Sequence, residues 1–298
     1  MTELMNTKAV AAYLGINEKK VYALAKAKAI PCSRVTGKWV FPKKLIDQWI
    51  ETSTGAASQT GDSGAERRFL LVAGSDDPCL GILRDLYGRR TGSCLYTAPS
   101  GSTAGLTAIR EGAADVATSH LLDGETGDYN VPFAKRMVPS GAVVASLFYR
   151  ELGLIVGTGN PKRLRGLRDL VRRRARIVNR QPGSGTRHYF ELELARLSIS
   201  PKELRGYDHV VATHLETGLE VLAGQADAGI GTKAAAQMLG LEFVPLARER
   251  FDVLIPKARF FERGIQVFMD IIGSRDFRGR VAAVGGYDVS ESGRIIAG

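Results

Sequence analysis

The 298-residue chain has little of what small secreted proteins and membrane proteins depend on. Its three cysteines, Cys32, Cys79 and Cys94, are too few and too scattered for a disulfide framework, and they lack the spacing of metal ligands. No apolar run approaches the roughly 18 residues of a membrane-spanning helix. Residues 1–8 lack the basic and apolar regions of a signal peptide. We therefore expect a cytoplasmic protein that does not associate with a membrane.

The sequence also has little that points to catalysis or to a metal cofactor. It has no Walker A motif, and its four histidines lack ligand-like spacing with acidic residues. Ser184 and His188 are one helical turn apart, but Ser184 lacks the Gly-x-Ser-x-Gly elbow of hydrolases. Residues 229–234 match a dinucleotide-binding pattern, yet they lie late in the chain and have no acidic ribose partner. These absences predict a protein that is not an enzyme and that holds no metal or other cofactor.

The positive charge of the chain is concentrated near its start. The net charge is +10, from 41 Lys and Arg against 31 Asp and Glu. Residues 1–50 hold nine basic and three acidic residues, whereas residues 51–66 hold three acidic and no basic ones. A dense positive field of this kind is typical of a nucleic-acid-binding module. The small and polar residues of 51–66 predict a flexible linker, so two separately folded domains are expected at 1–50 and 67–298.

The first fifty residues carry the pattern of a helix-turn-helix. The spacing of apolar residues predicts a helix over 7–14, capped by Asn6 or Thr7, and a second over 18–27, capped by Asn17. A short turn that contains a glycine separates them. Residues 34–41 then predict a hairpin, and residues 42–50 a last short helix.

This stretch resembles the excisionase/MerR-type winged helix-turn-helix module. The resemblance is carried by residues 7–16, Val21-Tyr22, Ile30-Pro31 and residues 37–42. It implies that the second helix enters the major groove of double-stranded DNA and that the hairpin grips the adjacent phosphates. The candidate DNA-binding residues are Thr7, Asn17, Lys19, Lys20, Tyr22, Lys26, Arg34 and Lys38.

The rest of the chain alternates short apolar runs with helical stretches, which predicts an α/β fold with largely parallel sheets. Strands are expected at 69–74, 143–148, 153–156, 175–179 and 227–230, and a helix from Leu80 to about Arg89. Residues 109–117 and 221–229 also match each other at an offset of 112. This repeat favours two similarly built lobes, with ligands bound where the strands end.

Three short loops rich in glycine and hydroxyl groups precede helices, at residues 74–76, 100–103 and 182–187. A helix N-terminus offers unpaired backbone N–H groups and the positive end of its dipole. Glycines and hydroxyls at such a place can surround an anion. Each loop alone is typical of ordinary helix capping, but three together in an α/β scaffold favour an anion site.

Long motifs in this region resemble the periplasmic-binding-protein-like domain that is fused to helix-turn-helix regulators and molybdopterin-biosynthesis proteins. They are Ala-Asp-Val-Ala at 114–117, His-Leu-Leu-Asp at 120–123, Gly-Asp-Tyr-Asn-Val-Pro-Phe at 127–133, Asn-Arg-Gln-Pro-Gly-Ser-Gly-Thr-Arg at 179–187, Gly-Tyr at 206–207 and Phe-Val-Pro-Leu at 243–246. The likeness implies a two-lobed type II binding-protein fold related to molybdate- and tungstate-binding proteins. It places lobe I at about 67–149 and 250–298, lobe II at about 150–249, and a hinge near 149–152 and 246–250.

The resemblance also implies which residues line the cleft between the lobes. The candidates are Ser75, Ser102, Thr103, His120, Ser184, Gly185, Thr186, Arg187 and Thr217. Arg180 and Arg187 complicate the choice of ligand, and Arg187 leaves two ligand classes open. If it points into the cleft, an organic acid or sulfonate is as well suited as a metal oxyanion, because these anions usually meet an arginine fork. If it pairs with Glu191 one helical turn later, it is structural.

The combined pattern predicts a one-component transcriptional regulator that binds DNA and senses a small anion, with molybdate or tungstate as the first expectation. We expect a homodimer or a higher homo-oligomer, because a single two-helix reader with few base contacts gives little affinity alone. One alternative is the same regulator with an organic acid or sulfonate as ligand. The other is an excisionase-like architectural protein or a molybdenum-cofactor accessory, whose DNA binding no ligand switches.

Overall fold

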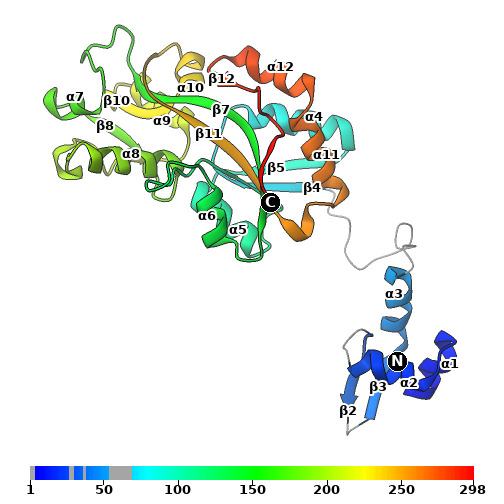
Figure 1. The fold of residues 1–298 in the computed structure, drawn as a ribbon. Helices are drawn as coiled ribbons and strands as arrows, with labels where there is room; N and C mark the ends of the chain where they lie inside the picture. Colours follow the sequence, from blue (N-terminus) through cyan, green and yellow to red (C-terminus); the bar gives the residue numbers. More distant parts are fainter. Residues whose placement is uncertain (1–3, 27–29, 36–37, 54–68) are drawn as a thin grey trace. The chain divides into compact units, whose positions relative to one another are not determined.

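The computed structural model describes residues 4–26, 30–35, 38–53 and 69–298. The chain divides into two compact units, residues 1–66 and 67–298. In the described part of the first unit, three helices pack on a small antiparallel sheet with the strand order β1-β3-β2 (Figure 1). Its elements are β1 (Leu4–Met5), α1 (Thr7–Leu14), α2 (Glu18–Lys26), β2 (Ser33–Val35), β3 (Lys38–Pro42) and α3 (Lys43–Ser53).

Local capping explains where the first two helices begin and where α1 ends. The side chain of Asn6 accepts a hydrogen bond from the Ala9 N–H at 2.9 Å, and Asn17 does the same for Lys20 at 2.8 Å. Gly15 ends α1 in the left-handed region with φ of 65°, a conformation that costs glycine little. The predicted helix-turn-helix and the following strands are present, and strand β1 was not predicted.

The third helix extends beyond its predicted end. Helix α3 runs to Ser53, so the first three residues of the predicted linker are helical. The remainder of the predicted linker, residues 54–66, lies outside the described residues. The core of the first unit is formed by buried side chains from its helices and from β3, among them Val10, Val21, Phe41 and Ile46.

The second unit is a mixed ten-stranded sheet covered by helices (Figure 1). The strand order is β5-β4-β6-β11-β7-β10-β8-β9, with β12 and β13 paired to β7. Up to the middle of the unit its elements are β4 (Phe69–Gly74), α4 (Leu80–Thr91), β5 (Cys94–Ala98), α5 (Ser102–Arg110), β6 (Val116–Ser119), α6 (Val131–Met137), β7 (Ala142–Val156), α7 (Leu167–Arg172) and β8 (Ile177–Arg180). The later ones are α8 (Gly185–Arg196), η1 (Pro201–Glu203), β9 (Val210–Val211), α9 (His214–Leu222), β10 (Ala228–Thr232), α10 (Lys233–Met238), β11 (Glu242–Pro256), η2 (Lys257–Arg259), α11 (Arg263–Ile272), α12 (Arg275–Val284), β12 (Tyr287–Asp288) and β13 (Ile295–Ala297).

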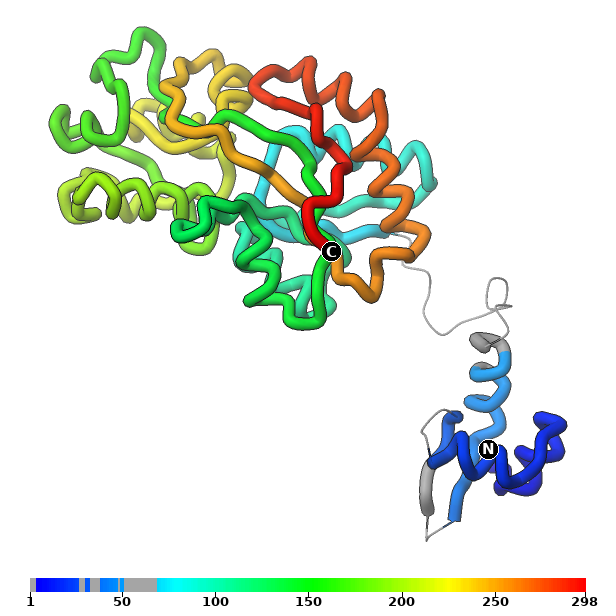
Figure 2. The backbone as a smooth tube through the Cα atoms, viewed as in Figure 1, coloured from blue at the N-terminus to red at the C-terminus, as the bar shows by residue number. Residues whose placement is uncertain are grey.

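Two long strands correct the expectation of a largely parallel sheet. The predicted strands at 143–148 and 153–156 are one strand, β7, which pairs antiparallel with the equally long β11. Parallel pairing holds within β4–β6 and within β8–β10, on either side of this pair. Figure 2 shows both strands crossing the unit, with the C-terminal segment beside them.

The apolar core of the second unit divides along these two strands. One set of buried residues includes Phe148 and Phe251, and another includes Leu152. The change falls between Phe148 and Leu152 on β7, and near Ala247 on β11, where the register is irregular. We call the side that contains β4–β6 lobe I and the side that contains β8–β10 lobe II.

The internal repeat in the sequence corresponds to one structural device used in both lobes. Asp115 accepts a hydrogen bond from the Leu71 N–H at 2.7 Å, and its own N–H donates to the Leu71 carbonyl. Asp227 makes the same pair of bonds with Arg176 in lobe II. In each lobe a carboxylate thus fixes the start of a strand against its parallel neighbour, so the polar loops after these strands begin at equivalent places.

A substitution at Gly105 tests how closely α5 packs against the end of β4. A methyl group at Gly105 in α5 would lie 2.6 Å from the Gly74 Cα and 2.8 Å from the Ala73 carbonyl oxygen, both backbone atoms. We expect Gly105→Ala to lower the free energy of unfolding by about 1–3 kcal/mol. The matched control is Gly279→Ala in α12, where no atom lies within 4 Å, and it should raise stability by about 0.5–1 kcal/mol. Urea unfolding of both variants checks this, and equal effects would contradict the close packing.

Candidate functional site

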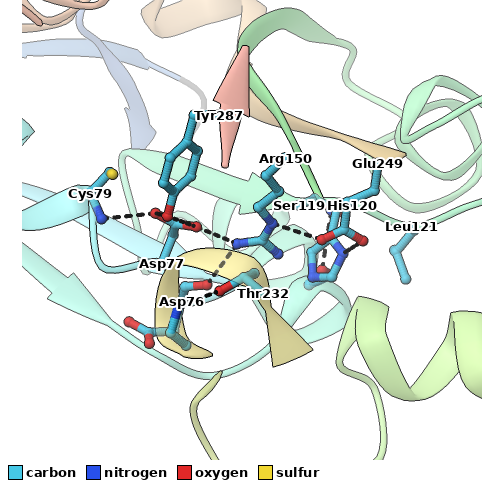
Figure 3. A network of polar contacts seen from close by, with 12 residues as sticks. Asp76, Asp77, Cys79, Ser119, His120, Leu121, Arg150, Thr232, Glu249 and Tyr287 are labelled. Atoms are coloured by element: carbon cyan, nitrogen blue, oxygen red, sulfur yellow. Dashed lines mark hydrogen bonds and ion pairs between the residues drawn. The ribbon is translucent and has the colours of Figure 1, made fainter. Parts of the chain in front are cut away.

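A chain of buried charged groups lies at the junction between the lobes (Figure 3). Arg150 on β7 donates to Glu249 on β11 at 2.7 Å and to Asp77 at 2.6 Å. His120 Nδ1 lies 2.8 Å from the other Glu249 oxygen, and the Tyr287 hydroxyl donates to Asp77. Arg150 and Glu249 face each other because β7 and β11 are paired in register at these residues. The two long strands therefore hold the network in one geometry.

The pKa directions follow from these contacts. Burial alone would raise the pKa of Glu249, but His120 and Arg150 overcome it and lower the pKa to about 2. Burial lowers the pKa of His120 despite the Glu249 carboxylate. Glu249 is thus ionised, and the hydrogen bond places the His120 proton on Nδ1, which leaves Nε2 as an acceptor.

A second buried arginine, Arg180, has no carboxylate at bonding distance in the part of the chain that the structure describes, so no such contact neutralises its charge. Arg180 is only 2% exposed, at the end of β8, and its guanidinium donates to the Ala212 carbonyl at 2.6 Å and to Gln181. Burial, and then repulsion from Arg150, lower its pKa to about 10. The nearby carboxyl of Asp76 has its pKa raised by burial and by Asp77. The cluster therefore contains a buried cation that no carboxylate contacts directly within the described residues, and this favours an anion.

Several buried polar atoms around these arginines have no hydrogen-bond partner among the described residues. They are Ser75 Oγ, Ser119 Oγ, His120 Nε2, Arg150 Nη2, Arg180 Nη1, Thr186 Oγ1 and both ring nitrogens of His214. Buried polar groups are normally paired, because desolvation without a bond costs about 1–3 kcal/mol each. Arginine and hydroxyl donors dominate the set. Such a group is suited to bind a small anion.

Contacts between the lobes bring these atoms together. The Thr103 N–H donates to the Gly183 carbonyl at 3.1 Å, which joins a loop of lobe I to a loop of lobe II. A methyl group at Gly185 would lie 2.7 Å from the His120 ring, so the start of α8 packs directly on this ring. The His120 and His214 rings are 6.4 Å apart. The lobes are thus in contact next to the cluster.

The predicted ligand residues fall into three groups: those with unpartnered polar atoms, those with contacts inside the protein, and Arg187. Ser75, His120 and Thr186 are buried with unpartnered polar atoms, as above. Others are buried or half-buried at the same loops, but within the protein they make local contacts. Ser102 Oγ accepts from the His120 N–H, Ser184 caps α8, Thr103 and Gly185 join the lobes, and Thr217 donates to the Thr213 carbonyl.

Arg187 takes the structural alternative. Its Nε donates to Glu191 at 2.6 Å, four residues later on α8, and its guanidinium stacks on the Tyr207 ring at 4.0 Å. Its Nη1 donates to the Arg180 carbonyl. The arginine of this motif that has an unpartnered nitrogen is instead Arg180, at its beginning.

Sequence reasoning missed most of the charged network. Arg150 lies in a pair of charged residues and Glu249 in a run of three, each inside an otherwise apolar strand, and that interruption is the signal that could have found them. Arg180 stands three residues before Gly183 in the recognised motif, but the sequence analysis singled out Arg187 there. His214 and Ser119 carry no local signal, since only the fold brings them to the cluster.

The candidate DNA interface lies on α2. Val21 and Ala25 face the core, and the opposite side of the helix is exposed. Asn17 caps this helix. The predicted contacts Lys19, Lys20, Tyr22 and Lys26 are all exposed, Tyr22 by 50%.

The remaining predicted DNA contacts differ in their surroundings. Lys38 is exposed on β3. Arg34 lies on β2, where it pairs with Trp39 of β3. Thr7 is only 8% exposed in the first turn of α1, which leaves little of its side chain for a phosphate.

His214 provides a pH test of the cluster. Burial, and then Arg180 and Arg150, hold its pKa well below 6.5, so its ring stays neutral in the folded protein. Below pH 6.5 the unfolded chain binds a proton that the folded protein excludes, so stability falls as pH falls. We expect His214→Gln to reduce this dependence by up to about 1.4 kcal/mol per pH unit, measured by urea unfolding between pH 7.5 and 5.5. The exposed His209→Gln is the control, and a wild-type slope in His214→Gln would contradict the assignment.

Comparisons with known proteins agree with this architecture. The uncharacterized protein YvgK of Bacillus subtilis is 29% identical over 301 residues, which covers 96% of each chain. A Clostridium perfringens protein assigned to a phosphate ABC transporter, solved with bound phosphate, aligns with a TM-score of 0.57 at 14% identity. It covers 74% of this chain and 98% of its own. An ABC-type phosphate transport receptor from Vibrio cholerae aligns with a TM-score of 0.50 at 15% identity, over 74% and 99%.

Family profiles assign both units. A helix-turn-helix domain matches residues 4–54, and a PBP superfamily domain matches residues 84–273. Neither is a family of enzymes, and within the described residues no helix is long and apolar enough to cross a membrane. The combination fits a DNA-binding regulator with a ligand-binding domain. The chain belongs to the PBP superfamily and carries a helix-turn-helix domain ahead of its PBP superfamily domain.

Proposed function

We propose that the protein is a one-component transcriptional regulator that binds a small anion between the lobes of its second unit. The observation that carries the proposal is the set of buried, unpartnered donors around Arg180, contributed by both lobes. A bound anion would pair these donors and offset the repulsion between Arg180 and Arg150. Because the donors come from both lobes, the anion would also favour the arrangement in which the lobes touch.

Molybdate and tungstate remain the first candidates for the ligand. Tetrahedral oxyanions of this kind are bound elsewhere through hydroxyls and backbone N–H groups, and Ser75, Ser119 and Thr186 supply free hydroxyls. The free nitrogen of Arg180 favours the second candidate class, an organic acid or sulfonate. Phosphate belongs in the same test, because the Clostridium perfringens neighbour holds it.

The DNA-binding half of the proposal depends on α2. Lys19, Tyr22 and Lys26 are three and four residues apart, so they share one exposed face that suits the major groove. A winged module of the excisionase/MerR class would add the β2–β3 hairpin at the neighbouring phosphates. A homodimer would place two such helices on two half-sites, which raises affinity and specificity. We place the protein in the cytoplasm, where it would meet DNA.

A thermal-shift screen of the full chain tests the anion site. Molybdate, tungstate, phosphate, sulfate, a dicarboxylate and a sulfonate are each added to the purified protein. We expect at least one anion, at 100 times its Kd, to stabilise the protein by about 2.7 kcal/mol. Arg180→Gln should weaken that binding by about 10- to 100-fold, because it removes a charged donor. Calorimetric titration measures the change.

Two controls keep the result specific. Arg187→Gln lies in the same motif but loses contacts to Glu191 and to the Arg180 carbonyl and leaves the Arg180 guanidinium in place, so it should change anion affinity far less than Arg180→Gln. Lys19→Ala/Lys20→Ala should weaken binding to duplex DNA and leave anion affinity unchanged. No stabilisation by any anion would favour the architectural alternative. Wild-type affinity in Arg180→Gln would place the anion elsewhere.

A further inference from the structure

A segment of lobe II contains the whole net charge of the second unit. Residues 162–176, which we call the basic segment, hold eight Lys and Arg and one Asp. The rest of residues 67–298 holds 24 basic and 24 acidic residues, so it is neutral. The segment includes α7, at the outer end of lobe II (Figure 1). A charge of +7 over 15 residues is a separate feature from the buried cluster.

The fold directs these charges outward. Leu164, Leu167 and Leu170 are buried in the core of lobe II and anchor the segment. Arg165, Arg168 and the other arginines of the segment are exposed. The segment thus presents its guanidinium groups to the outside on a fixed scaffold, so a partner would meet an ordered set of charges.

Few of these charges are neutralised within the protein. Among the described residues, side-chain bonds or ion pairs in the segment are made only by Lys162, to Asp227 at 3.8 Å, and by Arg176, to the Gly224 carbonyl. The single acid, Asp169, accepts a backbone N–H. Arg205 adds a further cation, because its guanidinium donates to the Arg174 carbonyl. The like charges repel one another, and a polyanion would relieve that repulsion.

Two of the arginines occupy positions that would suit glycine better. Arg163 has φ of 50° and Arg174 has φ of 51°, in the left-handed region that L side chains seldom adopt. Each residue costs free energy there relative to glycine. At both positions arginine adds a positive charge that glycine would not.

We propose that the basic segment binds the phosphate backbone of double-stranded DNA, as a second contact besides the helix-turn-helix. Seven of its eight cations are arginines, whose planar fork matches phosphate oxygens in two-point contact. The same chain carries a DNA-binding helix, so bound DNA is present at a high effective concentration. Phosphate contacts of this kind carry no sequence information; they add affinity and salt dependence.

Replacement of the two arginines at positive φ by glycine tests the proposal without an expected loss of stability, because glycine adopts this backbone conformation readily. Arg163→Gly/Arg174→Gly removes two charges and relieves the backbone at both positions. The matched control, Arg84→Gln/Arg275→Gln, removes two exposed arginines of lobe I, on α4 and α12. Fluorescence anisotropy measures the Kd of each full-length variant for a random-sequence duplex of about 40 base pairs, several helical turns, at a series of salt concentrations.

We expect the glycine variant to bind several-fold more weakly and to reduce the slope of log K against log salt by about 1 for each arginine that contacts a phosphate. The control should keep the wild-type slope. An unchanged slope in the glycine variant overturns the proposal. Binding of each variant to anionic vesicles and to polyglutamate is compared with duplex binding, and a loss of affinity that is confined to those two partners also overturns it. If Lys19→Ala/Lys20→Ala weakens duplex binding while the glycine variant does not, the regulator stands and this inference fails. Absence of duplex binding by the wild type overturns both.

Discussion

The pairing of Arg150 with Glu249 is the interaction on which the rest of the second unit depends. Both residues lie at the middle of 15-residue strands, where the lobes meet, and both are almost completely buried. Removal of one partner from a buried pair typically costs 3–5 kcal/mol, because the other charge is left unpaired. The pair therefore disfavours any register of β7 on β11 that would separate the two charges. That register decides where His120, Asp77 and the loops of both lobes come together.

The same pair gives the site its electrostatic character. Asp77 and Glu249 neutralise Arg150 and lower its capacity to attract a ligand, whereas Arg180 has no such carboxylate at bonding distance. An anion would therefore complete a charge arrangement that the protein leaves with an excess cation. The donors that would bind the anion come from lobe I and lobe II, so binding of the anion and contact between the lobes favour each other. This linkage is what would let a small ligand control a DNA-binding protein.

Regular elements and capping residues could be read from the sequence because their causes are local. Asn6 and Gly15 set the two ends of α1, Asn17 sets the start of α2, and the spacing of apolar residues predicts the buried face of each helix. The hydroxyl loops were also found, since each precedes a helix. The matching Asp115 and Asp227 marked a repeat whose hydrogen bonds prove equivalent.

The charged network could not be read in this way because its partners are far apart in the sequence. Arg150 meets Asp77 and Glu249 across separations of 73 and 99 residues, and only strand pairing brings them together. The choice between Arg187 and Arg180 depended on the direction of a side chain, which sequence spacing leaves open. The join of two predicted strands into β7 was missed because Arg150 and Glu151 interrupt the apolar pattern at the junction.

In a ligand-switched regulator anion binding and DNA binding are coupled, and one equilibrium measurement detects that coupling. The Kd of the full chain for duplex DNA is measured with and without a saturating amount of the anion that stabilises the protein most. We expect the Kd for DNA to change by about 5- to 150-fold, and the anion affinity to change by the same factor when DNA is saturating, because coupling is reciprocal. If the protein binds both partners and neither affinity changes, the two units act independently and the protein is not a ligand-switched regulator.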